Sequence, residues 1–179
     1  MRLERDPKRI AELARKKEDA NWTFRSFLKD CDLSVTELDS IVHKHYKTVS
    51  GQIDCRQCAN CCKVVRPLLK RKDVERLAAH LRVSRDQFAR EYLVKDKENG
   101  GHLFKSLPCS FLSNNLCTVY SHRPDDCRSY PHLQKKNFVF RLNQAFSNCS
   151  VCPIVYNVYE RLKRDISDSQ DNAYLSEQE

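Results

Sequence analysis

Nine cysteines between residues 55 and 152 have the clearest chemistry in this sequence. They are Cys55, Cys58, Cys61, Cys62, Cys109, Cys117, Cys127, Cys149 and Cys152. The two-residue gaps that separate Cys55, Cys58 and Cys61 let the backbone curl, so that successive sulfurs point toward a common centre. Four thiolates form the usual ligand set of a structural zinc ion and of an iron–sulfur cluster. The pattern therefore predicts metal binding, and nine thiols are enough for two centres.

The division of the thiols between two centres stays open from spacing alone. Neighbouring side chains diverge, so Cys61 and Cys62 are expected to serve different metals, or one of them lies outside the ligand set. One grouping places Cys55, Cys58, Cys149 and Cys152 around one centre, and Cys61 or Cys62 with Cys109, Cys117 and Cys127 around the other. Cys152-Pro153 matches the Cys-Pro ending of many cluster-binding runs.

The choice between bound metal and disulfides depends on the cellular compartment. Met1 to Lys17 is dense in charge and has no apolar stretch of the kind found in secretory signals. Reduced thiols in the cytoplasm favour metal over the alternative, an extracellular disulfide framework. No segment approaches the roughly 18 consecutive apolar residues that a membrane span requires, so we expect a cytoplasmic protein with no membrane partner.

Ligand type alone does not distinguish iron from zinc, because both metals accept four thiolates. A CxxCxxC core with a distant Cys-Pro favours an iron–sulfur cluster of the 4Fe-4S type, with a redox or cluster-carrying role. The alternative is a zinc-stapled module that binds protein or nucleic acid. The three glycines, Gly51, Gly100 and Gly101, form neither a P-loop nor a dinucleotide fingerprint, which argues against a nucleotide-dependent enzyme.

The net charge of +8 would usually indicate an anionic partner. Nine thiolates with two divalent ions would contribute about −5, however, and leave a total near +3. Stabilisation of the thiolates therefore explains the basic stretch from Lys63 to Lys72 more simply than phosphate binding does. A protein or redox partner fits this balance, whereas nucleic acid has weaker support.

Two arginines, Arg123 and Arg128, flank Cys127. They could act around the metal ligands, by lowering thiol pKa values or by donating hydrogen bonds to cluster sulfurs. Equally, they could pair with the neighbouring Asp125 and Asp126 across a surface turn. Two further expectations concern this region: His132 is more often exposed than a ligand at such a position, and Tyr120 packs against other side chains.

The elements that must position the thiols are mostly helical. We expect a first helix over about thirty residues capped by Asp6, and a second that begins at the Ser34–Glu37 capping box and ends at Gly51. Further helices are predicted at 73–81, 84–93 and 153–166, with short strands at 116–120 and 138–142. Cys31 stands alone and is expected to be a small buried hydrophobe.

These elements predict a mainly α fold with short irregular β segments (α+β). The expected organisation is an N-terminal helical extension over residues 1–50 and a metal-stapled cysteine-rich domain over residues 51–167. A disordered acidic tail is expected over residues 168–179.

Three ordered blocks give the sequence a family resemblance. They are Cys55-Arg-Gln-Cys58-Ala-Asn-Cys61-Cys62, then Pro108-Cys109-Ser-Phe-Leu, then the run from Cys117 to Pro131. The sequence resembles the CxxCxxCC family of zinc- or iron-chelating proteins, often labelled iron–sulfur cluster proteins, over residues 55–152. The resemblance implies metal binding at the matching cysteines. Some relatives are associated with lysine methylation of flagellin.

Overall fold

The computed structural model describes residues 2–176, and side chains within residues 2–166. The chain forms two compact units, which we call unit 1 (Met1–Asp54 and Pro131–Glu179) and unit 2 (Cys55–Tyr130). Both are mainly helical, and the few short strands are antiparallel, as the sequence predicts. Within the described residues, no helix combines the length and apolar character needed to cross a membrane.

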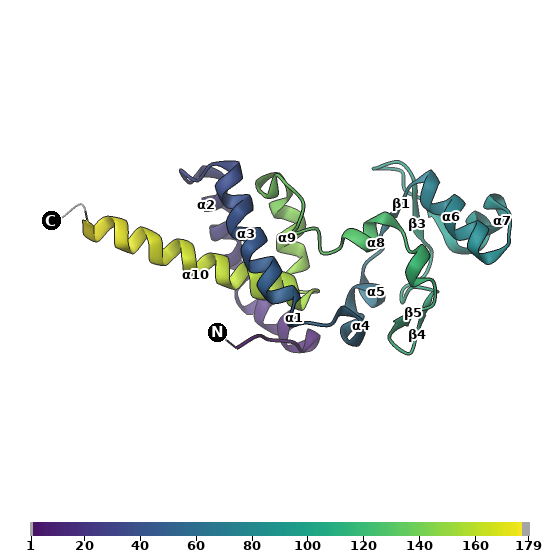
Figure 1. Cartoon of the computed structure of the whole chain (residues 1–179), viewed down its shortest axis with the longest axis horizontal. Helices are drawn as coiled ribbons and strands as arrows, with labels where there is room; N and C mark the ends of the chain where they lie inside the picture. The colour runs from purple at the N-terminus through teal and green to yellow at the C-terminus, as the bar shows by residue number, and fades with distance from the viewer. Residues whose placement is uncertain (1, 177–179) are drawn as a thin grey trace. The chain divides into compact units, whose positions relative to one another are not determined.

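Unit 1 is built from helices that come from both ends of the chain (Figure 1). They are α1 (Pro7–Lys16), α2 (Glu18–Asp30), α3 (Val35–Ser50), the 3-10 helix η2 (Phe138–Arg141), α9 (Leu142–Asn148) and α10 (Pro153–Ser176). α10 packs against α3, α1 and α9. Its buried side chains include Val158 and Leu162, which are 1% and 0% exposed. The core of unit 1 therefore joins segments that are more than a hundred residues apart in sequence.

The first predicted helix begins where expected but is interrupted. The Asp6 carboxylate accepts a hydrogen bond from the Lys8 backbone N–H at 3.0 Å, and Pro7 is the first helical residue. At Lys17, however, φ is −105° and ψ is 17°, so α1 ends and α2 begins. α1 packs on α10, whereas α2 packs on α9 and also contacts α10, where the Phe24 and Tyr159 ring centroids are 5.4 Å apart.

The capping box of α3 forms as predicted, with Ser34 and Glu37 each bonding the other's backbone, and the helix is capped by Gly51. At the other end of the chain, α10 continues to Ser176, beyond the expected end at residue 166. No glycine or proline follows Pro153, so nothing in the sequence stops this helix. The predicted tail at 168–179 therefore overlaps α10, and its last three residues lie outside the described part of the chain.

The predicted strand at 138–142 is wrong, because these residues form η2 and the start of α9. The two carboxylate oxygens of Asp39 accept hydrogen bonds from the N–H groups of Asn137, at 2.7 Å, and Phe138, at 2.8 Å. Asn137 itself has φ 61°. A buried carboxylate on α3 thus caps a helical turn about a hundred residues later in the chain.

Unit 2 combines short helices with two small sheets. Its elements are α4 (Cys55–Cys58), α5 (Asn60–Val64), β1 (Leu68–Leu69), α6 (Arg71–Leu81), α7 (Arg85–Tyr92), β2 (Leu93–Lys95), β3 (His102–Phe104), β4 (Leu112–Ser113), β5 (Leu116–Cys117), the 3-10 helix η1 (Tyr120–His122) and α8 (Asp125–Ser129). The helices predicted at 73–81 and 84–93 are confirmed as α6 and α7. Strands β1, β3 and β2 form one antiparallel sheet in that order, and β4 pairs with β5.

The core of unit 2 is small and aromatic. Phe88, Phe104 and Phe111 are buried, with ring centroids 5.6 Å apart between Phe104 and Phe111. Cys109 and Cys117 pack against this cluster as partly buried neighbours. The core therefore ends directly at two of the predicted metal ligands.

Candidate metal centre

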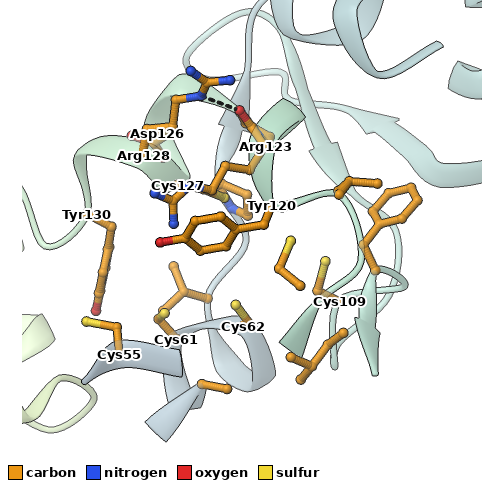
Figure 2. A pocket seen from close by; sticks show the side chains of 18 of the residues that line it. Cys55, Cys61, Cys62, Cys109, Tyr120, Arg123, Asp126, Cys127, Arg128 and Tyr130 are labelled. Carbon is orange, nitrogen blue, oxygen red and sulfur yellow. Dashed lines mark hydrogen bonds between the residues drawn. The ribbon is translucent and has the colours of Figure 1, made fainter. Parts of the chain in front are cut away.

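A pocket of about 240 Å³ in unit 2 collects most of the predicted ligands. Its lining includes six cysteines: Cys55, Cys61, Cys62, Cys109, Cys117 and Cys127. They come from α4, α5, the turn before β4, β5 and α8. Figure 2 shows the sulfurs of Cys61, Cys62 and Cys109 facing the space beside the Tyr120 ring, with Cys55 and Tyr130 at one edge. Stretches of chain up to 72 residues apart thus supply thiols to one cavity.

The CxxCxxCC segment reaches the pocket through a break between α4 and α5. The break is at Ala59, which has φ 48° and is 5% exposed, and whose N–H bonds the Cys55 carbonyl at 2.9 Å. A left-handed residue reverses the helical path, so the chain curls between Cys58 and Cys61. The curl expected from the two-residue gaps is therefore made by one strained alanine.

Backbone hydrogen bonds fix the second and third cysteine stretches. The Cys109 N–H donates to the Cys62 carbonyl at 2.8 Å, which joins two stretches 47 residues apart. Cys117 lies opposite Leu112 in the β4–β5 hairpin, whose turn residues Asn114 and Asn115 have φ of 49° and 61°. Two such residues form the type of turn that suits a two-residue hairpin. Cys62, Cys109 and Cys117 are thus held by the main chain.

The helix that carries Cys127 is anchored by carboxylates. Asp73 is 1% exposed on α6, and its Oδ1 accepts the Asp125 N–H at 3.0 Å. Arg76 joins the same carboxylate oxygen at 2.5 Å and the Asp125 carboxylate at 2.9 Å. The Asp126 carboxylate accepts the Leu68 N–H at 3.1 Å. The position of Cys127 therefore depends on the ion-pair network of α6.

The surroundings of Cys62 favour its ionised form. A hydrogen bond from Cys61 lowers the pKa of Cys62 to about 7, with the charges of Arg123 and Lys63 acting in the same direction against partial burial. A thiol with this pKa is about half ionised at pH 7, and the thiolate is the form that binds metal. Within this adjacent pair, Cys61 donates the hydrogen bond that stabilises the Cys62 thiolate.

Three other pocket thiols have raised pKa values: Cys109, Cys117 and Cys127. Burial raises the pKa of Cys127 to about 12, and the negative charges of Cys62, Cys109 and Cys117 add to the effect. Burial also raises the pKa values of Cys109 and Cys117, again with a contribution from the charge of Cys62. These four sulfurs are close enough to repel one another once ionised. A cation among them would relieve that repulsion.

Arg123 and Arg128 have different roles, although the sequence suggested one common role for the two. The Arg123 guanidinium lies 3.9 Å from the centre of the Tyr120 ring, and its charge lowers the pKa values of Cys62 and Cys117. The Arg128 side chain instead donates to the carbonyls of Arg123, at 3.0 Å, and Ser121 (Figure 2). Arg123 therefore acts on the thiols, and Arg128 holds the loop.

Tyr120 packs against another side chain as expected: it is 49% exposed, lines the pocket and stacks with the Arg123 guanidinium. Two other residues differ from the surroundings expected for them. His132 is 3% exposed in unit 1, which makes the expected exposed histidine wrong. Cys31 is only half-buried, with its sulfur 3.8 Å from the Leu28 carbonyl oxygen. The cation–π pair of Tyr120 and Arg123 joins residues three apart across the 3-10 helix η1, a spacing that places side chains on one face.

Cys58 and the second CxxC pair do not line the pocket. Cys58 is half-buried in α4, whereas Cys149 and Cys152 are 2% and 6% exposed in unit 1. Burial raises the pKa of Cys149 far above its usual range. All ten cysteines lie in the described part of the chain, and none of them forms a disulfide. A centre shared by Cys55, Cys58, Cys149 and Cys152 stays a prediction.

The donor set fits a soft metal or a metal–sulfur cluster. Within the described residues, no three His, Cys, Asp or Glu side chains already surround a point where one ion could sit. Tetrahedral thiolates about 2.3 Å from a zinc ion lie roughly 3.8 Å from one another, so a single ion would require the side chains to turn inward. The pocket of about 240 Å³ is several times the roughly 30 Å³ that a water molecule occupies in the liquid. It has room for several atoms.

Comparison with known proteins identifies one match. Residues 54–153 fit the model of the CxxCxxCC family, described as "Putative zinc- or iron-chelating domain". No curated protein and no solved structure matches the chain. The matched region includes all of unit 2 and extends over Cys149 and Cys152.

Proposed function

This chain belongs to the CxxCxxCC family of zinc- or iron-chelating domains, and we propose that unit 2 binds an iron–sulfur cluster of the 4Fe-4S type. The proposed ligands are Cys62, Cys109, Cys117 and Cys127. One observation carries the proposal: these four thiols line one pocket and interact through their charges. Four cysteines are the number that such a cluster requires.

The size of the pocket supports a cluster over a single ion. A lone zinc ion needs little space beyond its coordinating atoms, because its four ligands close around it. The space of about 240 Å³ between the thiols suits a group that contains several metal and sulfide atoms. The thiol pKa values and the number of ligands are consistent with either metal, so the volume of the pocket is the discriminating feature.

Residues around the ligands adjust the site. Cys61 donates a hydrogen bond to Cys62 and is proposed as a support of this ligand, while Arg123 places positive charge near Cys62 and Cys117. Hydrogen bonds and charges of this kind set the reduction potential of bound clusters. When bound, the cluster would supply one-electron chemistry or be passed to another protein. We place either role in the reducing cytoplasm.

The test is anaerobic purification followed by iron, sulfide and zinc analysis and a visible spectrum. We expect a brown protein with about four iron and four sulfide per chain, whose visible absorption bleaches on reduction. Cys117→Ser and Cys127→Ser should each lose most of the iron. Cys31→Ser is the matched control, since Cys31 lies in unit 1 and outside the pocket lining. A colourless protein that contains stoichiometric zinc would overturn the proposal in favour of the zinc-stapled module.

Electron transfer and cluster transfer can be distinguished with the same purified protein. An electron carrier should be reduced and reoxidised repeatedly without loss of iron, whereas a cluster carrier should transfer its iron and sulfide to an apo-protein. The association of relatives with lysine methylation stays a prediction, which incubation with a methyl donor and a lysine-rich protein would test.

A further inference from the structure

Exposed apolar side chains in unit 2 gather beside the pocket cysteines. Val64, Leu107, Leu116 and Tyr120 are 49%, 38%, 55% and 49% exposed. Val64 follows Cys62 by two residues, Leu107 precedes Cys109 by two, and Leu116 directly precedes Cys117. Tyr120 lines the pocket itself. A unit with so small a core gains nothing for its own stability by leaving four large apolar side chains in water.

Backbone contacts bring the elements that carry these side chains together. The hydrogen bond from the Cys109 N–H to the Cys62 carbonyl joins the segment of Leu107 to α5, which carries Val64. α4, which carries Arg56, contacts β5, which carries Leu116. We call Val64, Leu107, Leu116 and Tyr120, with Arg56 and Arg123, the pocket rim.

The positive charge of the protein is concentrated in the same unit. Residues 55–130 hold 15 Lys and Arg against 8 Asp and Glu, a net +7, which leaves only +1 of the total +8 for unit 1. Ionisation of four thiols would still leave about +3. The pocket lining contains three arginines, Arg56, Arg123 and Arg128, and one carboxylate, that of Asp126.

We propose that the pocket rim is the docking surface for a protein partner whose own surface is acidic around an apolar centre. The proposal rests on the proposed function, because such a partner would exchange electrons or the cluster with the pocket. Opposite charges speed encounter and set orientation, while the exposed apolar side chains supply the buried centre of the contact. Phosphate groups of a nucleic acid would gain from the arginines but not from Val64 and Leu116, so a protein fits this surface better.

The experiment measures binding of the full chain to defined probes by calorimetry. The acidic probe is a plant-type ferredoxin, the basic one is cytochrome c, and a short duplex DNA represents nucleic acid. We expect binding to ferredoxin that weakens with salt and exceeds binding to both other probes. Arg56→Glu should weaken it by about tenfold at low salt. The double variant Val64→Thr/Leu116→Thr should weaken it by at least about fivefold at any salt concentration.

Lys97→Glu is the control, because Lys97 is exposed in the same unit, carries the same charge and does not line the pocket. It should change the affinity by less than about twofold. The rim substitutions alter exposed side chains, and circular dichroism confirms that each variant is folded. Unchanged affinity of the double variant, or tighter binding to DNA than to ferredoxin, would overturn the docking surface. Iron content of the same samples reports separately on the proposed function, since probe binding is measured whether or not a cluster is present.

Discussion

The two units of this chain are stabilised in different ways. Among the side chains that the structure describes, unit 1 buries twenty apolar residues and unit 2 buries ten. In unit 1 the buried groups form a continuous helical core around α10. In unit 2 nine of the ten form one cluster at the sheet and α6–α7, and the thiol pocket lies against that cluster, with Phe104 and Phe111 shared between the two.

The difference indicates where folding free energy comes from. Domains of about 60 residues are marginal on hydrophobic burial alone, and small ones commonly add a metal. Unit 2 spans 76 residues and places Cys109 and Cys117 at the edge of its core. The bound group is therefore expected to complete the core of unit 2, whereas unit 1 is expected to fold on side-chain packing alone.

Removal of the metal should have the largest effect, and it should destabilise unit 2 but not unit 1. Oxidation with ferricyanide in the presence of a chelator is expected to abolish hydrogen-exchange protection of α6 and β3, because bound metal in small domains supplies an apparent 10–16 kcal/mol, roughly, of folding free energy. Protection of α3 and α10 should persist. Equal loss of hydrogen-exchange protection in both units would contradict this difference in stabilisation, and would indicate that Cys149 and Cys152 are also ligands.

Matched core truncations should have the next largest effects. Leu162→Ala in unit 1 and Leu77→Ala in unit 2 remove the same atoms from side chains that are both 0% exposed. Each should cost about 2–5 kcal/mol of unfolding free energy. Only Leu77→Ala should also reduce metal content, measured by elemental analysis after heating. Retention of metal by Leu77→Ala at a lowered melting temperature would show that the pocket does not depend on this core.

Two buried aspartates allow a subtler comparison. Asp39 caps η2 in unit 1, and Asp73 holds α6 and α8 in unit 2. Asp39→Asn and Asp73→Asn should each cost about 1–3 kcal/mol, because the neutral amide is a weaker acceptor for the N–H groups it must satisfy. Asp73→Asn should also weaken metal retention through Cys127, which chelator titration would measure. Asp39→Asn should leave that titration unchanged.

The smallest expected effect is a loss of stability of unit 2 at acid pH. The rings of His80 and His122 stack at 3.9 Å, and the pKa of His122 is lowered by burial first and then by the charges of His80, Arg128 and Arg76. Protonation then favours the unfolded state, so the stability of unit 2 should fall as pH drops below about 6.5. NMR titration should give a His122 pKa below that value, and His80→Gln should raise it. Burial also lowers the pKa of His45 in unit 1, so both units should weaken in acid.

Local signals in the sequence were sufficient for many helix ends. Ser34 caps α3 as predicted, and Ser84 caps α7 in the same way, because each cap involves residues within three positions. The cysteine spacing likewise identified the segment that lines the pocket. The spacing leaves the ligand set open, since only the tertiary structure shows that Cys62 has a lowered pKa and lies near Cys109 and Cys127.

Features that depend on distant partners were not predictable. The carboxylate that caps η2 belongs to Asp39, 98 residues before Asn137, so the short apolar run at 138–142 taken alone predicts a strand. The interruption at Lys17 comes before α2, which packs on α9 as well as on α10. Ala59 adopts a left-handed conformation that its residue type disfavours, so the sequence does not predict the break between α4 and α5.

Unit 1 is built from two separate stretches of the chain, and this affects the order in which its parts are synthesised. Its helices α1 to α3 emerge from the ribosome long before α9 and α10, which complete their core. Unit 2 is translated as one uninterrupted stretch between them. The nascent cysteine-rich segment therefore has all four proposed ligands available while the flanking helices still await their partner, so cofactor loading can precede closure of the rest of the molecule.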